Sequence, residues 1–284
     1  MIKLIECPRD AMQGLHDFIP TEIKAAYINL LLQVGFDTID FGSFVSAKAI
    51  PQMRDTVAVL NKLNISSSSS KLLAIVANLR GVQDAVQHEH ITYLGFPFSV
   101  SETFQQRNTN SSIKQSLVTV EEMMSLCSKY NKKAVVYLSM GFGNPYGDEW
   151  SHELLEYWTE QLAERGVQML SLADTIGISN PDKIRYIFPH LTKQFPELEL
   201  GVHLHSAATN WEEKIEAAYR SGCKRFDAAL KGYGGCPMAA DKLTGNIATE
   251  NIMRYLKDQG EELKLDMDKW QEAMEYSSSV FVSS

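Results

Sequence analysis

The chain has 284 residues, 44% of them hydrophobic, and this length allows one large α/β barrel or two smaller domains. The formal net charge of −8 and the pI near 5.4 argue against a nucleic-acid or anionic-membrane partner, because both need a basic face. The four cysteines form no CxxC pair, no apolar run reaches membrane-spanning length and the first residues resemble no targeting peptide, so we expect a cytoplasmic protein.

Short β-rich apolar runs alternate with longer amphipathic runs along the chain. Strands are predicted at residues 2–7, 38–44, 71–78, 91–100, 134–140, 167–174, 198–205 and 225–232. Amphipathic helices are predicted at residues 21–35, 112–130, 151–166 and 180–195. The strands are apolar throughout rather than alternating, which is typical of a parallel sheet covered on both faces. The serine run at 66–70 indicates a helix-to-strand loop and not a domain boundary.

The count of strand–helix units decides the fold class. Eight such units in this length predict a (β/α)8 TIM barrel. A doubly wound open sheet is the alternative, but no GxGxxG follows the first strand. An additional C-terminal helix is predicted at 266–280, outside the barrel. We therefore expect one catalytic domain over 1–284, with a barrel core at about 2–255 and a helical extension at about 256–284.

Polar residues follow the predicted strands at their C-terminal ends, where barrels of this class form their active sites. They lie after or near the ends of the first, second, sixth and seventh strands, and in the segment after the eighth. These residues are Arg9, Asp10, Asp40, Ser43, Asp174, Thr175, His203, His205 and Asn246.

His203 and His205 are two positions apart, so in a strand they project from the same face. Barrel closure makes the first strand a neighbour of the eighth, and Asp10 and Asn246 could then reach the same point. Two imidazoles, a carboxylate and an amide oxygen leave positions for water and substrate, as in a catalytic metal site. Against this, a strand-end Asp is often only a helix cap, and two histidines can belong to a packed interior. Together the residues indicate a divalent-metal barrel enzyme.

The stretch "GYGGCP" at residues 232–237 contains three glycines and Cys236. This composition predicts a mobile or tightly turned loop in which the thiol is accessible. A thiol carried over the site could donate or accept a proton when the loop closes. The alternative is a small apolar residue in a turn.

At these motifs the chain resembles the 3-hydroxy-3-methylglutaryl-CoA lyase family, in the metal-dependent barrel superfamily that also holds isopropylmalate and homocitrate synthases. The similar segments run in order from residue 2 to about residue 255. They are "PRDAMQ", "IDFGSFVSAKAIPQMRD", "SLADTIG", "VHLH" and "GYGGCPMAADKLTGNIATEN". The glycine-glycine-cysteine-proline loop favours the lyase over the synthases.

The resemblance implies cleavage of 3-hydroxy-3-methylglutaryl-CoA into acetyl-CoA and acetoacetate with the help of Mg²⁺ or Mn²⁺. The implied metal ligands are Asp10, His203, His205 and Asn246. Arg9 would stabilise the enolate-like oxygen, and Cys236 would work in proton transfer, beside Asp10 and His203 as catalytic residues. The implied supporting or substrate-binding residues are Gln13, Asp40, Ser43, Asp174 and Thr175.

The chain departs from the family at two informative positions. Ser206 stands where the family usually has an acidic residue, and Asp40 stands where the lyase has glutamate. Alternatives are therefore a related acyl-CoA lyase, an aldolase for a 4-hydroxy-2-oxo acid, a condensing synthase, or a metal-binding barrel without turnover. The expected partner is an acyl-CoA substrate, and we expect a homodimer or another homo-oligomer.

Overall fold

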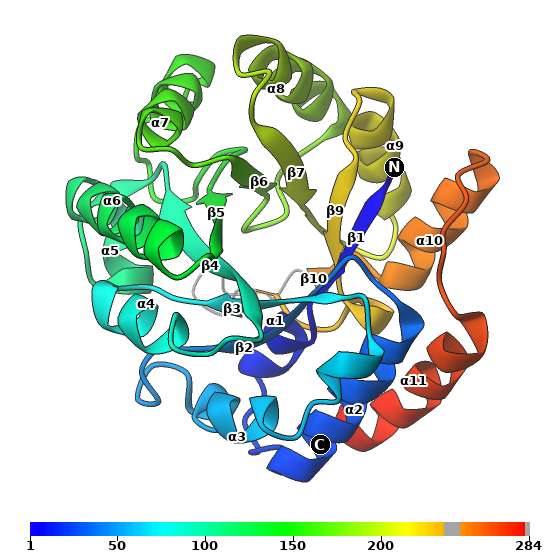
Figure 1. Ribbon diagram of the computed structural model, residues 1–284. Coiled ribbons are helices and arrows are strands. Elements are labelled where there is room, and N and C mark those ends of the chain that lie inside the picture. Colours follow the sequence, from blue (N-terminus) through cyan, green and yellow to red (C-terminus); the bar gives the residue numbers. More distant parts are fainter. Residues whose placement is uncertain (236–244, 282–284) are drawn as a thin grey trace.

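Parallel strands close into a barrel inside a ring of helices (Figure 1). The computed structural model describes residues 1–235 and 245–281. The barrel strands follow the order β1-β2-β3-β4-β5-β6-β7-β9, and β1 pairs with both β2 and β9 to close it. Their bounds are β1 (Lys3–Glu6), β2 (Thr38–Ser43), β3 (Lys71–Ile75), β4 (Ile91–Ser99), β5 (Lys133–Ser139), β6 (Met169–Ala173), β7 (Glu199–His203) and β9 (Arg225–Ala228). The predicted TIM barrel is confirmed.

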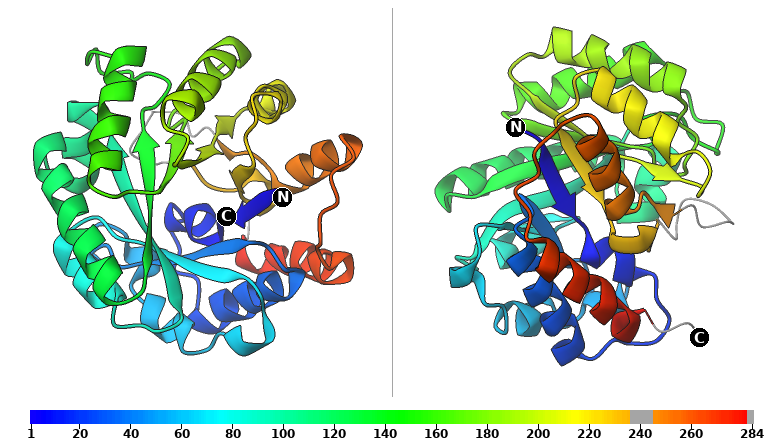
Figure 2. Two further views of the ribbon diagram at one scale, coloured as in Figure 1. Left: turned by 45° about the horizontal axis from the view of Figure 1, so that its top comes forward. Right: turned by 90° about the vertical axis from the view of Figure 1, so that its right-hand side faces the viewer.

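Eleven α-helices are formed by the described residues, and most of them cover the outside of the barrel (Figures 1 and 2). They are α1 (Pro8–Gln13), α2 (Thr21–Val34), α3 (Thr56–Leu60), α4 (Leu79–Ala85), α5 (Glu102–Thr109), α6 (Ile113–Lys129), α7 (His152–Glu164), α8 (Pro181–Gln194), α9 (Trp211–Arg220), α10 (Thr249–Asp258) and α11 (Met267–Val280). No helix in this part of the chain is both long and apolar enough to span a membrane.

Local sequence signals explain several helix ends. A capping box at Ser112 starts α6, because its hydroxyl accepts from the Gln115 amide while the Gln115 side chain accepts from the Ser112 amide. Gly35 ends α2 in the left-handed conformation with φ of +90°, which glycine adopts without steric cost. The serine run lies in the loop before β3, as the sequence predicts.

The additional C-terminal helix, α11, packs on α2 in the outer helical layer (Figure 2). Trp270 meets Phe36 edge-to-face, with ring centroids 5.9 Å apart, and Phe281 meets Tyr27 at the same separation. Both pairs bury aromatic surface in the geometry that such rings prefer. The C-terminal segment therefore covers the outside of the barrel near its N-terminal units.

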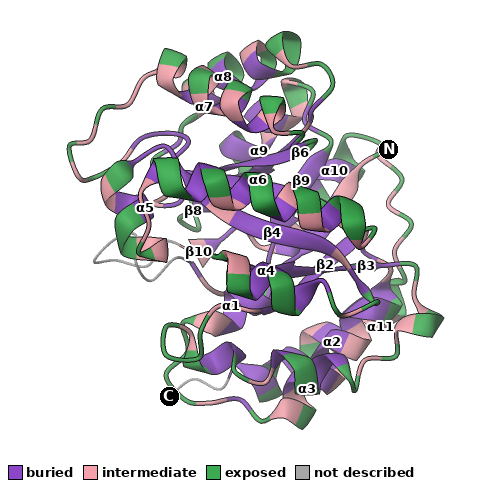
Figure 3. Cartoon of the chain, turned by 60° about the vertical axis from the view of Figure 1, so that its left-hand side comes forward, coloured by how far each residue is buried: buried purple, intermediate pink, exposed green. Residues whose placement is uncertain are grey.

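The strands are buried on both faces, as Figure 3 shows. Their outward side chains join the helices in one large core, and a smaller apolar cluster fills the inside of the barrel. That inner cluster comprises Leu73, Ile75, Tyr93, Val135, Tyr137 and Met169. The barrel is thus a packed interior, so a ligand has room only at its mouth.

The predicted strand at 198–205 is shorter in the structure. β7 ends at His203, which pairs with Ala173 of β6 and Asp227 of β9, because β6 ends at Ala173 and β9 ends one residue after Asp227. The chain instead forms β8 (His205–Ser206), which pairs antiparallel with β10 (Gly245–Asn246) at the barrel mouth. The predicted strand at 225–232 likewise ends earlier, at Ala228.

Candidate metal centre

Three side chains from distant parts of the chain meet at the mouth of the barrel. Asp10, His203 and His205 each offer a ligand atom, and these atoms lie within 4.8 Å of one another. Asp10 lies in α1, which begins directly after β1, while His203 ends β7 and His205 begins β8. All three side chains are buried. A carboxylate with two imidazoles at this separation can hold a divalent cation.

His205 has one ring nitrogen that no neighbour satisfies. Its Nδ1 lies 3.1 Å from the carbonyl oxygen of Thr175, which only accepts, so Nδ1 carries the proton. Its Nε2 is buried and has no hydrogen-bond partner among the described residues. Burial, followed by the nearby charge of His203, lowers the pKa of His205 to about 4. The ring is therefore neutral, with a free lone pair that suits a cation.

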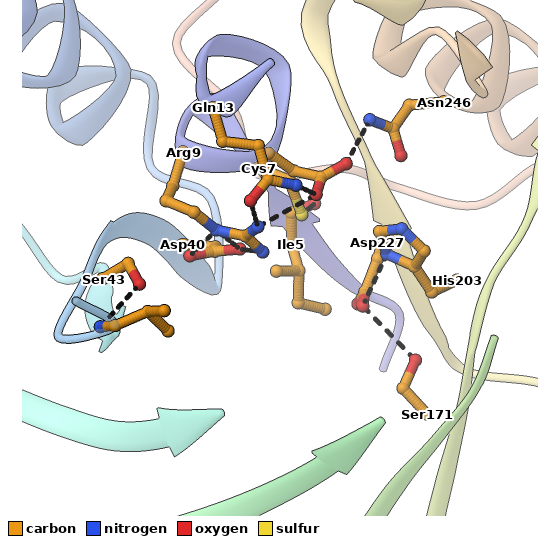
Figure 4. Close-up of polar contacts among 12 residues, drawn as sticks. Ile5, Cys7, Arg9, Gln13, Asp40, Ser43, Ser171, His203, Asp227 and Asn246 are labelled. Atoms are coloured by element: carbon orange, nitrogen blue, oxygen red, sulfur yellow. Dashed lines mark hydrogen bonds and ion pairs between the residues drawn. The ribbon is translucent and has the colours of Figure 1, made fainter. Parts of the chain in front are cut away.

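His203 is oriented by a carboxylate that the sequence does not predict. Its Nδ1 lies 3.3 Å from Oδ2 of Asp227, and the same oxygen accepts from the Ser171 hydroxyl at 3.3 Å (Figure 4). Burial opposes protonation of the ring, but the bond to Asp227 and the charges of Asp10 and Asp227 raise the pKa of His203. Donation from Nδ1 to Asp227 leaves Nε2 as the nitrogen for a cation.

Asp10 is held by two donors from its own helix, α1, and by one from β10. It accepts from Nη1 of Arg9 at 2.9 Å, from Nε2 of Gln13 at 2.7 Å and from Nδ2 of Asn246 at 2.7 Å. Burial disfavours ionisation, but the charge of Arg9, followed by that of His203, lowers the pKa of Asp10. Asn246 therefore meets Asp10 through its amide nitrogen, and ligation through its oxygen stays a prediction.

Arg9 is fixed between two carboxylates. Its Nε donates to both oxygens of Asp40, at 3.2 and 3.0 Å, and its Nη1 donates to Asp10 and to Oε1 of Gln13 (Figure 4). Burial opposes the charge, but Asp40 and Asp10 raise the pKa of Arg9 above its ordinary value, so the guanidinium stays charged. Burial also raises the pKa of Asp40 to about 6, although Arg9 works against that rise.

Asp174 lies behind the cluster and contacts it indirectly. Its carboxylate accepts from the Ser179 amide at 3.0 Å and from Nζ of Lys214 at 2.9 Å. The same ammonium donates to the carbonyl of His205 at 2.8 Å. Thr175 supports the neighbouring turn, since its hydroxyl accepts from the Met140 amide at 2.9 Å. Asp174 and Lys214 thus fix the backbone that carries His205.

Two cavities lie at the ends of these strands. The histidines open into one of about 320 Å³, which is also lined by Arg9, Asp10, Gln13, Tyr137 and Thr175. Ser43 lines the other, of about 360 Å³, and its hydroxyl accepts from the Val45 amide at 3.1 Å. Ser43 therefore lines a neighbouring cavity, which shares Val45 with the first but has neither histidine in its lining. Cys236 lies outside the described residues.

Known proteins of one family match this chain over most of its length. The HMGL-like family model matches residues 2–276. A cytoplasmic 3-hydroxy-3-methylglutaryl-CoA lyase of Rattus norvegicus is 31% identical over 276 residues, which are 97% of this chain and 80% of that protein. A hydroxymethylglutaryl-CoA lyase of Bacillus subtilis is 32% identical over 265 residues, 92% of this chain and 87% of its own length.

Solved structures show the same likeness in three dimensions. An HMG-CoA lyase of Acinetobacter baumannii, in complex with coenzyme A and 3-methylmalate, superimposes with a TM-score of 0.91 at 29% identity, covering 99% of this chain and 91% of that one. A hydroxymethylglutaryl-CoA lyase of Pseudomonas aeruginosa gives a TM-score of 0.91 at 28% identity, covering 100% of this chain and 94% of its own.

Proposed function

The chain belongs to the HMGL-like family, and from that premise we propose that it is a divalent-metal-dependent carbon–carbon lyase. The proposed reaction is the retro-aldol cleavage of 3-hydroxy-3-methylglutaryl-CoA to acetyl-CoA and acetoacetate. The names of the relatives and the coenzyme A in the A. baumannii structure support an acyl-CoA substrate. The observation that carries the proposal is the Nε2 of His205, which has no hydrogen-bond partner among the described residues and lies beside Asp10 and His203 at the floor of a cavity.

The cation is proposed to be held by Asp10, His203 and His205, with Asn246 as a further ligand. When bound, Mg²⁺ or Mn²⁺ supplies Lewis acidity toward the tertiary hydroxyl of the substrate and fixes the orientation of that group. Two imidazoles suit Mn²⁺ at least as well as Mg²⁺, which prefers oxygen ligands. Asp227 and Lys214 act as positioning residues, because one orients the His203 ring and the other holds the His205 backbone.

Arg9 is proposed to bind the oxygen that gains negative charge as the thioester fragment departs. It lines the cavity, and its bonds to Asp40, Asp10 and Gln13 use four of its five N–H groups, so one N–H of Nη2 remains. A guanidinium held in this way needs little reorganisation as the charge develops. Asp40 thus serves to fix the plane of Arg9.

Proton transfer requires one group to accept the hydroxyl proton and another to protonate the acetyl fragment. Asp10 and His203 are proposed for the first step, since both line the cavity where the substrate hydroxyl would bind. Cys236, carried by the glycine-rich segment, is proposed for the second step. This division agrees with a retro-aldol reaction, in which acid and base act on different atoms of the substrate.

We also propose a domain organisation, an oligomeric state and a cellular location for the enzyme. We propose one catalytic domain, a homodimer or other homo-oligomer, and a cytoplasmic location like that in the name of the rat relative. Light scattering on the purified chain would measure its mass in solution, and fractionation of the source cells would measure its location. A monomer, or a protein confined to an organelle, would contradict these two proposals.

The function is tested with protein that has been stripped of metal by a chelator. We expect no cleavage of 3-hydroxy-3-methylglutaryl-CoA until Mn²⁺ or Mg²⁺ is added, and then equal yields of acetyl-CoA and acetoacetate. His205→Gln should abolish the metal response, whereas His190→Gln, on a partly exposed histidine paired with Glu156, should retain it. Cleavage of another acyl-CoA or of a 4-hydroxy-2-oxo acid alone would reassign the substrate. Turnover that is equal with and without metal would overturn the proposal.

A further inference from the structure

A second group of metal-ligating side chains lies against the first and shares one residue with it. Cys7, His203 and Asp227 each offer a ligand atom within 4.8 Å of the others. His203 ends β7, Asp227 lies in the adjacent strand β9, and Cys7 directly follows β1, which pairs with β9 on its other side. The Cys7 amide donates to the Ala228 carbonyl at 2.9 Å, and His203 is paired in register with Asp227. The group is therefore fixed by the barrel itself.

Asp227 has an acceptor that no described residue satisfies. Its side chain is buried, and Oδ2 bonds to His203 and Ser171, but Oδ1 has no hydrogen-bond partner among the described residues. Arg225 lies two residues earlier on the same strand, yet its Nε, Nη1 and Nη2 also lack hydrogen-bond partners there, so it does not pair directly with Asp227. A buried carboxylate oxygen without a hydrogen bond is costly, so Oδ1 of Asp227 needs a donor or a cation as its partner.

Cys7 supplies a soft donor to the same place. The thiol is fully buried, and among the described residues it makes a long hydrogen bond of 3.7 Å to the Ile5 carbonyl. Sulfur, imidazole nitrogen and carboxylate oxygen are together the ligands of tetrahedral zinc sites, whereas Mg²⁺ takes oxygen ligands and rarely a thiolate. The donor set thus favours a thiophilic cation over the cation proposed for catalysis.

We propose that Cys7 Sγ, His203 Nδ1 and Asp227 form an inner site for Zn²⁺ or a cation of similar chemistry, distinct from the site made by Asp10 and His205. Binding releases the thiol proton, since the thiolate is the ligand. The Nδ1 proton of His203 moves to Nε2, because a neutral imidazole has one lone pair and the inner cation uses the one on Nδ1. His203 is then lost to the catalytic cation.

The inner site therefore antagonises the outer one through the tautomer of His203, the residue that the two groups share. This consequence rests on the proposed function, because it assumes that His203 Nε2 serves the catalytic cation. The existence of the inner site does not rest on it. The experiments below detect the thiolate–metal bond directly and need no turnover, so their failure and the failure of the proposed function are separate results.

The first test titrates Co²⁺ into the chelator-stripped protein and follows thiolate-to-cobalt charge-transfer absorption. We expect a band that saturates at one thiolate-bound cobalt per chain. Cys7→Ser should lose the band. Two control variants, Cys223→Ser and Cys236→Ser, should keep it, because neither cysteine belongs to the group; Cys223 is a buried thiol elsewhere in the barrel. Absence of any band, or a band that survives in Cys7→Ser, overturns the proposal.

A second test leaves Cys7 unchanged, in case its substitution prevents folding. A zinc-soaked crystal of the unaltered protein is measured at energies on both sides of the zinc absorption edge. We expect an anomalous peak bonded to Cys7 Sγ, His203 Nδ1 and a carboxylate oxygen of Asp227. Zinc found only between Asp10 and His205, or bound to neither group, overturns the proposal.

Discussion

Lys214 and Asp174 form an ion pair of 2.9 Å with both side chains almost completely excluded from solvent. The ammonium also donates to the carbonyls of His205 and Gly177, so each of its three protons has an acceptor. A buried pair that is satisfied in this way connects α9 to the loop after β6 and to β8, which begins at His205. The pair links the stability of the barrel mouth to the position of a proposed metal ligand.

Lys214→Met should therefore destabilise the protein and weaken its metal site. Removing one partner leaves a buried charge without compensation, which costs about 3–5 kcal/mol. The free energy of unfolding by urea measures this loss, and Mn²⁺ titration measures the second effect. Lys224→Met is the control, because its pair with Glu261 is partly exposed and such pairs contribute about 0–1 kcal/mol. Equal losses of unfolding free energy in the two variants would show that the buried pair stabilises the protein no more than the exposed pair does.

Arg9→Lys should lower kcat by about 10²–10³-fold, as loss of one oxyanion donor does in other enzymes. Lysine keeps the charge but cannot bond Asp40, Asp10 and Gln13 in one plane. Steady-state kinetics with saturating Mn²⁺ would measure the change. Arg54→Lys, at the separate cavity, should leave kcat within a factor of two or so. A rate defect in Arg9→Lys that excess Mn²⁺ fully restores would assign Arg9 to metal binding instead.

Asp227→Ala should weaken Mn²⁺ binding by ~10–100-fold, the usual effect of removing the partner that orients a metal-bound histidine. Asp227→Asn should weaken it less, because its amide oxygen can still accept from Nδ1 of His203. Ser171→Ala, which removes only the hydroxyl donor to Asp227, should have the smallest effect. Calorimetric titration of the three variants measures the order. An unchanged affinity in Asp227→Ala would remove Asp227 from the site.

Glu6 gives the protein a specific pH dependence of stability. Burial raises the pKa of Glu6 to about 8, above its ordinary 4.5, although bonds from Thr249 and the Leu230 amide oppose the rise. Between these values the folded state binds more protons than the unfolded state. The contribution of Glu6 is thus complete below about pH 4.5 and is lost as the pH rises through about 8.

Glu6→Gln removes this dependence, because its amide can donate to the Thr249 hydroxyl while its oxygen accepts from Leu230. The midpoints of thermal unfolding should be similar at pH 5, and the variant should be the more stable protein at pH 8.5 by several degrees. Glu22→Gln, on an exposed carboxylate, should follow the wild type at both values. A constant difference between wild type and Glu6→Gln across this range would contradict the raised pKa.

The sequence predicts the barrel well because each strand is a short apolar run between clear helix signals. Asp10, His203 and His205 could be proposed as neighbours because strand ends of a closed barrel converge. The end of the seventh strand could not be predicted, because "GVHLHS" has no turn signal. The break between β7 and β8 depends on the pairing of β8 with β10, which lies far along the chain. The length of that strand is a tertiary effect.

The positioning residues Asp227 and Lys214 could not be predicted from the sequence, for a related reason. Asp227 sits inside the run "RFDAALKG", and its contact with His203 depends on the register between β7 and β9, which local pattern does not encode. Lys214 lies on α9 among solvated charges and becomes buried only because α9 packs behind the start of β8 at His205. A lysine at the apolar face of an amphipathic helix is the one signal that could have found it.

The central claim is that Asp10, His203 and His205 hold the catalytic cation, and a crystal grown with Mn²⁺ tests it most directly. An anomalous difference map at the manganese absorption edge should show one strong peak bonded to the Asp10 carboxylate and to Nε2 of each histidine. A map with no peak among these three side chains, from a crystal in which the protein is active with Mn²⁺, would contradict the account.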